Sequence, residues 1–128
     1  MIVKQISVFV ENKSGNLSDI LTVLGDNGID ISAMSLADTT DFGILRMIVS
    51  DTEKAVEILK AQRLAVKCTD VTALYMEHTP GGLSKILSVL KKEDIDVEYL
   101  YAFVEKSGTD ARVVMKVSSP EKVEELFI

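Results

Sequence analysis

Apolar positions along the chain recur with two different periods, and these periods alternate. In residues 5–10 and 71–77, Val, Ile, Phe, Tyr and Thr dominate, which is typical of β-strands. The stretch after each of these segments has apolar residues at i, i+3, i+4 and i+7, which is one face of a helix. These residues are Leu17, Ile20, Leu21 and Leu24 in the first half and Leu83, Ile86, Leu87 and Leu90 in the second. The pattern therefore predicts a strand followed by an amphipathic helix, twice.

Further elements follow in the same order in each half. Second and third strands are predicted at residues 30–37 and 44–49 in the first half and at 96–104 and 111–117 in the second. Asp51 and Ser119 are residue types that commonly cap helix N-termini, so a second helix is predicted after each of them. Residues 64–68 predict a short fourth strand in the first half only.

The two halves are copies of one another. Residues 14–24, Ser-Gly-Asn-Leu-Ser-Asp-Ile-Leu-Thr-Val-Leu, return at residues 80–90 as Pro-Gly-Gly-Leu-Ser-Lys-Ile-Leu-Ser-Val-Leu. Residues 49–54 return at 117–122, with an offset that is two positions longer. We therefore expect a two-residue insertion between the second and third strands of the later copy, where a hairpin loop tolerates extra length.

Each copy has the element order β-α-β-β-α-β of the ferredoxin-like, split βαβ fold. We therefore expect an α+β protein of two modules, residues 1–69 and 70–128, each an antiparallel sheet with both helices on one face. The second module is expected to lack its last strand, so that its first strand at 71–77 has an open edge. An open edge pairs readily with another chain, and a homo-oligomer is therefore expected.

Composition narrows the classes of function. The 128 residues are 47% hydrophobic and 27% charged, which is typical of a folded globular chain. The net charge of −6 argues against nucleic acid and anionic membranes as partners, because both are bound by clustered Lys and Arg. An RNA-recognition sheet would also need aromatic residues among basic ones, and neither copy supplies such a strand. With no signal-peptide pattern and no long apolar run, a cytoplasmic location is expected.

Residue types that carry catalysis are scarce. His78 is the only histidine and Cys68 the only cysteine, so neither a nucleophilic triad nor a zinc site is supplied. We expect Cys68 to be a small buried apolar side chain. Asp38 and Asp41 are expected to lie in a polar hairpin loop, and an enzyme that uses them with His78 stays an alternative. No catalytic residue, metal or cofactor is predicted.

A glycine-containing turn precedes the first helix of each copy. Gly15, Gly81 and Gly82 would let the backbone approach a bound group closely, and a helix N-terminus attracts a carboxylate or phosphate. The same glycines would serve an ordinary strand-to-helix turn, and duplication copies a turn whether or not it binds anything. The turn by itself therefore leaves both interpretations open.

Two ordered sets of residues resemble a known family. Residues 9–17, Phe-Val-Glu-Asn-Lys-Ser-Gly-Asn-Leu, with Gly-Ile-Asp-Ile at 28–31, resemble the opening of an ACT domain. The second copy matches again, with Glu-His-Thr-Pro-Gly-Gly-Leu at 77–83 and Asp-Ile-Asp-Val at 94–97. Together they resemble small stand-alone proteins of two ACT modules. The resemblance implies a non-catalytic, allosteric sensor that binds a free amino acid at an interface between modules and regulates a separate enzyme or transporter of amino-acid metabolism.

The resemblance also implies which residues touch the ligand. The family's contact residue three places before the turn glycine corresponds to Asn12, with His78 as its counterpart in the second copy. Asp30 and Asp96 stand where the family has Asn, and each would face the ligand's ammonium group because a carboxylate repels a carboxylate. Ser14 replaces the family's usual Pro. The expected set is Asn12, Ser14, Gly15, Asn16, Leu17, Asp30, Ile31, His78, Pro80, Gly81, Gly82, Leu83, Asp96 and Val97.

An alternative role follows from the same resemblance. The chain is also similar to the small regulatory subunit of acetolactate synthase, for which contact with a large catalytic chain is the main task. Co-purification with such a chain would favour this alternative, whereas a response to one or a few amino acids would favour the sensor.

Overall fold

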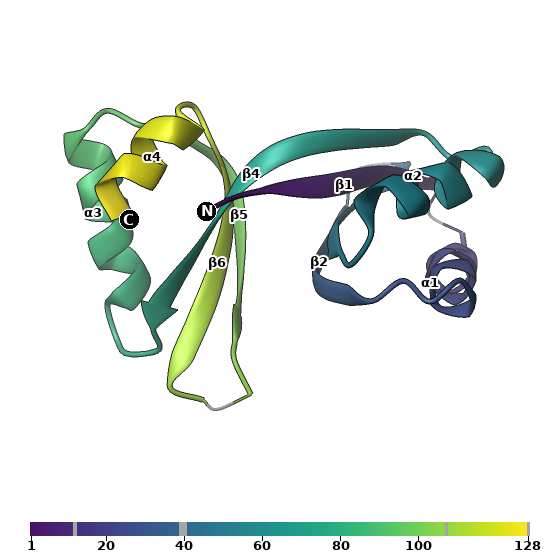
Figure 1. Cartoon of the computed structure of the whole chain (residues 1–128), viewed down its shortest axis with the longest axis horizontal. Helices are drawn as coiled ribbons and strands as arrows, with labels where there is room; N and C mark the ends of the chain where they lie inside the picture. The colour runs from purple at the N-terminus through teal and green to yellow at the C-terminus, as the bar shows by residue number, and fades with distance from the viewer. Residues whose placement is uncertain (12, 39–40, 107, 128) are drawn as a thin grey trace. The chain divides into compact units, whose positions relative to one another are not determined.

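The described residues form ten elements in the predicted order, except that two predicted strands, 64–68 and 71–77, are one strand (Figure 1). The computed structural model describes residues 1–11, 13–38, 41–106 and 108–127. The first five elements are β1 (Ile2–Glu11), α1 (Asn16–Asp26), β2 (Ile31–Asp38), β3 (Phe42–Val49) and α2 (Thr52–Ala61). The last five are β4 (Val66–Glu77), α3 (Gly82–Lys92), β5 (Val97–Val104), β6 (Asp110–Val117) and α4 (Pro120–Phe127). The strand order is β2-β3-β1-β4-β6-β5, and β1–β3, β2–β3, β4–β6 and β5–β6 pair antiparallel.

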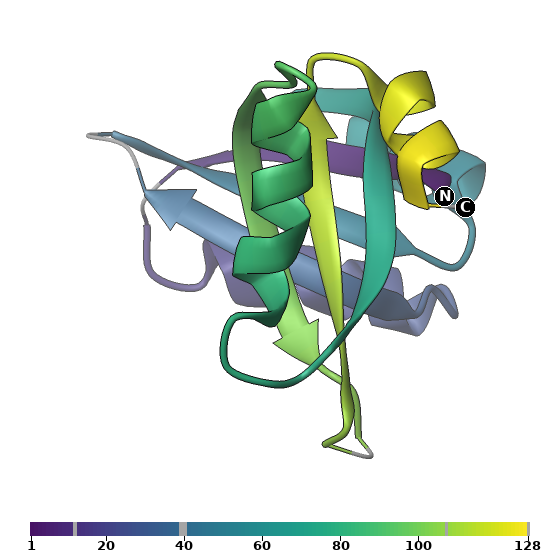
Figure 2. The same cartoon turned by 90° about the vertical axis from the view of Figure 1, so that its left-hand side faces the viewer.

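The chain divides into two compact units. The first unit is Lys4–Thr69, and the second consists of Met1–Val3 together with Asp70–Ile128. Each unit has its own hydrophobic core between the helices and one face of the sheet. Figure 2 shows α3 and α4 on the same face of the second unit's strands. The expected α+β fold of two ferredoxin-like modules is confirmed.

Alternating side chains of the strands build the first core. Ile6, Val8 and Val10 of β1 point to the helices and are at most 5% exposed. They meet Leu24 of α1 and Leu59 of α2, both fully buried. The i, i+3, i+4 spacing of the sequence therefore marks the buried face of α1, because only one stripe of a surface helix faces its core.

The ends of the elements agree with their sequence signals. The Asp51 carboxylate accepts a hydrogen bond from the Lys54 N–H at 3.2 Å, so Asp51 is the N-cap of α2. Helix α4 begins at Pro120, directly after Ser119. Residues 39–41 separate β2 from β3, whereas residues 105–109 separate β5 from β6. The two-residue insertion therefore lies between the second and third strands of the later copy, as predicted.

The fourth strand differs from its prediction. The sequence predicts separate strands at 64–68 and 71–77, but β4 is one continuous strand of 12 residues. Thr69 and Asp70 lie between the two predicted segments, and the chain has neither Gly nor Pro there to turn it. The strand therefore continues from the first unit into the second.

Among the described residues no strand follows α4, but the edge beside β4 is not open at Ala73. The Met1 ammonium donates to the Ala73 carbonyl oxygen at 3.0 Å, and the Ala73 N–H donates to the Met1 carbonyl oxygen at 2.8 Å. The ammonium also lies 3.8 Å from the Glu124 carboxylate. The expectation of an open edge is wrong at this position, because Met1 occupies it.

The cysteine of β4 differs from its prediction. Cys68 is exposed, so the expectation that it is buried is wrong. Residues 66–70 of β4 are all partly or fully exposed, and the buried part of the strand begins at Val71. Among the helices that the structure describes, none is long and apolar enough to cross a membrane.

Candidate functional site

A cavity of about 390 Å³ lies in the first unit, between α1 and the segment that joins α2 to β4. Its volume falls in the range of small-molecule sites, which is roughly 300–1,000 Å³. The lining residues are Phe9, Val10, Glu11, Asn16, Asp19, Ile20, Val23, Phe42, Gln62, Arg63, Leu64 and Ala65. The cavity therefore has walls from β1, α1, β3 and the α2–β4 segment.

The local hydrogen bonds explain why a gap exists there. The Phe9 N–H donates to the Ala65 carbonyl oxygen at 3.1 Å, which pairs β1 with the residue just before β4. Beyond this pair the α2–β4 segment turns towards α2, while β1 continues through Val10 to Glu11. The Asn16 side-chain amide donates to the Glu11 carbonyl oxygen at 3.1 Å and holds the start of α1 to the end of β1.

The end of α2 places Arg63 at the cavity in an uncommon backbone conformation. Arg63 has a φ of 62°, in the left-handed region that L side chains rarely adopt. The Arg63 N–H donates to the Lys60 carbonyl oxygen, and the Leu64 N–H donates to the Leu59 carbonyl oxygen. This is the Schellman arrangement, in which glycine is the usual left-handed residue. The turn brings both Arg63 and Leu64 to the cavity wall.

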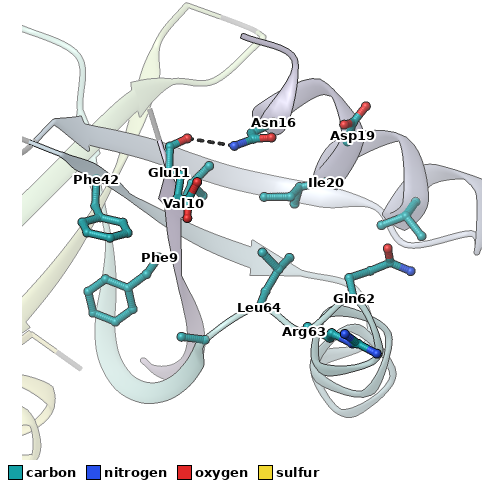
Figure 3. Close-up of a pocket in the computed structure, with 12 residues that line it drawn as sticks. Phe9, Val10, Glu11, Asn16, Asp19, Ile20, Phe42, Gln62, Arg63 and Leu64 are labelled. Atoms are coloured by element: carbon teal, nitrogen blue, oxygen red, sulfur yellow. Dashed lines mark hydrogen bonds between the residues drawn. The ribbon is translucent and has the colours of Figure 1, made fainter. Parts of the chain in front are cut away.

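The lining includes both apolar and polar side chains. Figure 3 shows Phe9 and Phe42 on one side of the view and Gln62 and Arg63 on the other. Ile20 and Leu64 lie between them. Phe9 and Phe42 are 47% and 46% exposed, although they are large apolar side chains. Phe9 and Phe42 lie on the face of β1 and β3 that points away from the helices, because Val8 and Val10 alternate with Phe9 and face the first core.

Charged groups at the cavity include both signs. The Glu11 carboxylate is paired with the Lys13 ammonium at 3.1 Å. Within the part of the chain that the structure describes, the side chains of Asp19 and Arg63 have no ion-pair or hydrogen-bond partner. The cavity lining therefore includes one carboxylate and one guanidinium without a partner among the described residues, and they lie on opposite sides of Ile20 and Leu64 (Figure 3).

The predicted turn residues of the first unit lie beside this cavity, but only one of them lines it. Asn16 is the first residue of α1 and contributes to the wall. Ser14 and Gly15 are exposed in the turn, and Leu17 packs against the hydrophobic core. Asn12 lies outside the residues that the structure describes.

The corresponding turn of the second unit has the same shape. Gly81 has a φ of 84°, close to the 88° of Gly15, and each is the N-cap of its helix. His78 and Pro80 are exposed, and the His78 N–H donates to the Thr109 carbonyl oxygen at 3.0 Å. Leu83 packs against the second core.

Some backbone N–H groups in both turns already donate hydrogen bonds to carbonyl oxygens of the same turn. The Asn16 N–H donates to the Lys13 carbonyl oxygen at 3.2 Å, and the Gly82 N–H donates to the Thr79 carbonyl oxygen at 3.0 Å. A β-carbon on Gly82 would lie 2.5 Å from the Glu77 carbonyl oxygen. The glycines are therefore required by the turn itself, as the simpler of the two interpretations states.

The predicted strand-start residues lie away from the turns. In the first unit, Ile31 pairs with Val49 at one end of β3, whereas Glu11 pairs with Phe42 at the other. These ends are about 24 Å apart at the rise of an extended strand. Asp30 is exposed, and its N–H donates to the Ser50 hydroxyl at 3.0 Å. The structure therefore does not bring the turn and the strand start of this unit together.

The second unit repeats this separation. The Asp96 N–H donates to the Ser118 hydroxyl at 3.0 Å, and Val97 pairs with Val117 at one end of β6. Glu77, which precedes the turn, pairs with Asp110 at the other end. A ligand that touched both predicted halves of the site would therefore need two modules.

Most of the cavity lining was not predicted from the sequence. Asp19 and Val23 lie on a helix face that the periodicity marks only as partly apolar. Gln62, Arg63 and Leu64 belong to a short segment between two elements, which has no motif. A usable signal was Arg63 itself, because a helix end followed by a strand commonly has Gly at this place. Among the described residues, no group of three or more His, Cys, Asp or Glu side chains could hold a metal ion.

Comparison with families and curated proteins gives one match. A family model described as "ACT domain pair" matches residues 1–128. A search of curated proteins found no match to the chain.

Solved structures with the same fold include one with substantial sequence identity. Protein BT0572 from Bacteroides thetaiotaomicron is 42% identical, with a TM-score of 0.92 over 98% of this chain and 86% of that protein. The ligand-free regulatory subunit of aspartate kinase from Thermus thermophilus is 11% identical, with a TM-score of 0.70 over 98% and 93%. That of Thermus flavus is 14% identical, with a TM-score of 0.69 over 98% and 89%. At this low identity the two regulatory subunits share the fold.

Proposed function

The chain belongs to the ACT domain pair family, and from this premise we propose that it is a non-catalytic regulatory protein that binds a free amino acid. A family of paired regulatory modules supports this function over catalysis. The main support for this proposal is the cavity in the first unit. It has the volume of a small-molecule site, and its lining includes the Asp19 carboxylate and the Arg63 guanidinium, which are unpaired among the described residues. Asn16, which the family resemblance implies as a ligand residue, lines this cavity.

The regulatory output passes to a separate protein. The family resemblance implies an enzyme or transporter of amino-acid metabolism as the regulated partner, in the cytoplasm, and a homo-oligomer as the working state. Binding regulates such a partner only if the ligand favours one conformation or assembly over another, with a coupling free energy of about 1–3 kcal/mol in typical cases. The turn with His78 and Gly81 is the second candidate place for ligand contact, because it duplicates the turn with Ser14 and Gly15.

The proposed function is tested by thermal denaturation of the purified protein with each of the twenty amino acids at millimolar concentration. A ligand at about 100 times its Kd adds roughly 2.7 kcal/mol to the free energy of unfolding, which raises Tm by several degrees. We expect one amino acid, or a few chemically related ones, to raise Tm, and calorimetric titration to give a saturable heat.

A matched control separates specific binding from a general solute effect. The D-enantiomer of each active amino acid has the same charge and solubility, and it should leave Tm unchanged. Absence of any Tm rise and of any binding heat with all twenty amino acids would overturn the proposal. Gly81→Val, which forces a branched side chain onto a φ of 84°, tests whether the second turn contributes.

A further inference from the structure

We propose that a second copy of this chain docks face to face on the sheet of the second unit, so that Arg112 of each copy lies against Glu77 and Asp110 of the other copy. The surface concerned is the outer face of β4, β6 and β5, which points away from α3 and α4. The inference goes beyond the proposed function, because it names an interaction surface and the partner that this surface fits.

The register of the strands places five side chains in two adjacent rows on this outer face. In the first row, Tyr75 of β4 pairs with Arg112 of β6, which pairs on its other side with Phe103 of β5. In the second row, two residues further along each strand, Glu77 pairs with Asp110. An arginine with aromatic neighbours therefore lies beside a pair of carboxylates.

The side chains of both rows point away from the helices. Leu74 of β4, Val113 of β6 and Leu100 of β5 pack in the second core. Side chains alternate along a strand, so residues one or three positions away point to the opposite face. Tyr75 is 67% exposed, and both acidic residues of the second row are exposed as well. The two rows are therefore accessible from solvent.

The charges in the two rows have no counter-charge among the described residues. The Arg112 Cζ lies 5.6 Å from the centroid of the Tyr75 ring, and the Arg112 Nε is buried without a hydrogen-bond partner. Within the described ranges, neither Arg112 nor the side chains of Glu77 and Asp110 form an ion pair. Glu77 and Asp110 lie directly opposite each other, and like charges in such a pair destabilise a sheet. Charges of both signs would therefore gain from an added partner.

The two rows are complementary to a second copy of themselves. In a two-fold interface the same patch occurs on both sides, and each contact therefore occurs twice. A two-fold axis between the rows places Arg112 of each copy on the Glu77–Asp110 row of the other copy, with Tyr75 near the centre. Tyr and Arg are residue types that often dominate the binding energy of interfaces. A nucleic acid fits this surface less well, because the two carboxylates would repel its phosphates.

The first unit does not repeat this pattern of charges. At the corresponding positions, Phe9 pairs with Ile44 and Glu11 pairs with Phe42. These two rows have no cation, and the single carboxylate among these residues is paired with the Lys13 ammonium at 3.1 Å. The self-complementary surface is therefore specific to the second unit.

Charge reversal tests the contact without a change in either core. We expect the wild-type protein to be a dimer in sedimentation velocity experiments. Arg112→Glu places like charges against one another and should raise the dissociation constant of the dimer at least about tenfold. The double variant Glu77→Lys with Asp110→Lys should have the same effect. An equimolar mixture of these two variants should form dimers again, because every contact then joins opposite charges.

Two variants with the same changes of charge on the helices are the matched controls. Lys85 of α3 and Glu125 of α4 are exposed, and their helices cover the other face of the sheet (Figure 2). Lys85→Glu and Glu125→Lys should therefore leave the dissociation constant unchanged. The Tm of each variant shows whether its fold is intact.

Three results would overturn the inference. These are a wild-type protein that stays monomeric up to millimolar concentration, a dimer that persists in Arg112→Glu, and a mixture of the two charge-reversed variants that does not associate. None of these measurements uses an amino acid. A failure of this inference is therefore distinct from a failure of the proposed function, which is measured by the Tm and the heat of ligand binding.

Discussion

One backbone oxygen lies so close to Gly82 that no larger residue fits at this position. It is the first residue of α3, and a β-carbon there would lie 2.5 Å from the carbonyl oxygen of Glu77. Gly25, in the last part of α1, has no atom within 4 Å of the corresponding position. Gly82 is therefore required by the packing of the turn, whereas alanine fits at position 25 of the helix.

Alanine at position 82 and alanine at position 25 should change the stability in opposite directions. Gly82→Ala should lower the free energy of unfolding by about 1–3 kcal/mol, because a backbone carbonyl cannot move away from the new methyl group without strain. Gly25→Ala should raise it by about 0.5–1 kcal/mol, because alanine loses less backbone entropy in a helix. Urea denaturation of both variants measures these changes. Equal effects of the two substitutions would contradict the close approach.

Helix α2 shows how an element is bounded by signals at its two ends. It begins at the Asp51 cap and ends in the left-handed turn at Arg63 that forms part of the cavity wall. The buried face carries Ala55 and Leu59. The position of α2 on the sheet comes from this packing, whereas its length comes from the local caps. The Asp51 cap stabilises α2, and the turn at the end of α2 forms part of the cavity wall. The cap therefore helps to place this wall.

The cap leads to a prediction at the scale of this element. Asp51→Ala removes the acceptor of the Lys54 N–H and should destabilise the first unit by about 1 kcal/mol. Asp51→Asn keeps an oxygen acceptor and should retain most of that stability. Chemical denaturation of the two variants is the measurement, and an Asn variant as unstable as the Ala variant would show that the side-chain hydrogen bond is not the cause.

At the scale of the whole molecule, the division into units does not follow the order of the chain. Met1–Val3 belong to the second unit, although the next 66 residues, Lys4–Thr69, form the first. The two hydrogen bonds between Met1 and Ala73 occupy the edge of β4 that the second module's own elements leave unpaired. The N-terminal residues therefore contribute to a sheet edge that would otherwise expose backbone groups.

A deletion tests this contribution. Removal of residues 1–3 takes away both backbone hydrogen bonds at Ala73, each worth roughly 0.5–1.5 kcal/mol. The Ala73 amide should then exchange its hydrogen at least tenfold faster in native-state exchange measured by NMR. The Leu45 amide, in β3 of the first unit, is the internal reference and should keep its rate. An unchanged rate at Ala73 would show that Met1 does not protect this edge.

The sequence by itself determined the duplication, the order of the elements, the buried faces of α1 and α3 and the cap of α2. These features are local, because a period of 3.6 or 2 and a residue that caps a helix act over a few neighbouring positions. The family followed from the same short-range motifs, which occur twice in order.

Only the tertiary structure decided the continuity of β4, the pairing of Met1 with Ala73 and the composition of the cavity. Each depends on contacts between residues far apart in the chain. Phe9, Asp19 and Arg63 line one cavity although they are far apart in the chain, and the hydrogen bond between Phe9 and Ala65 joins two of the segments that form it. A local sequence pattern does not specify which distant segments lie opposite each other. The packing of the hydrophobic core in each unit determines this.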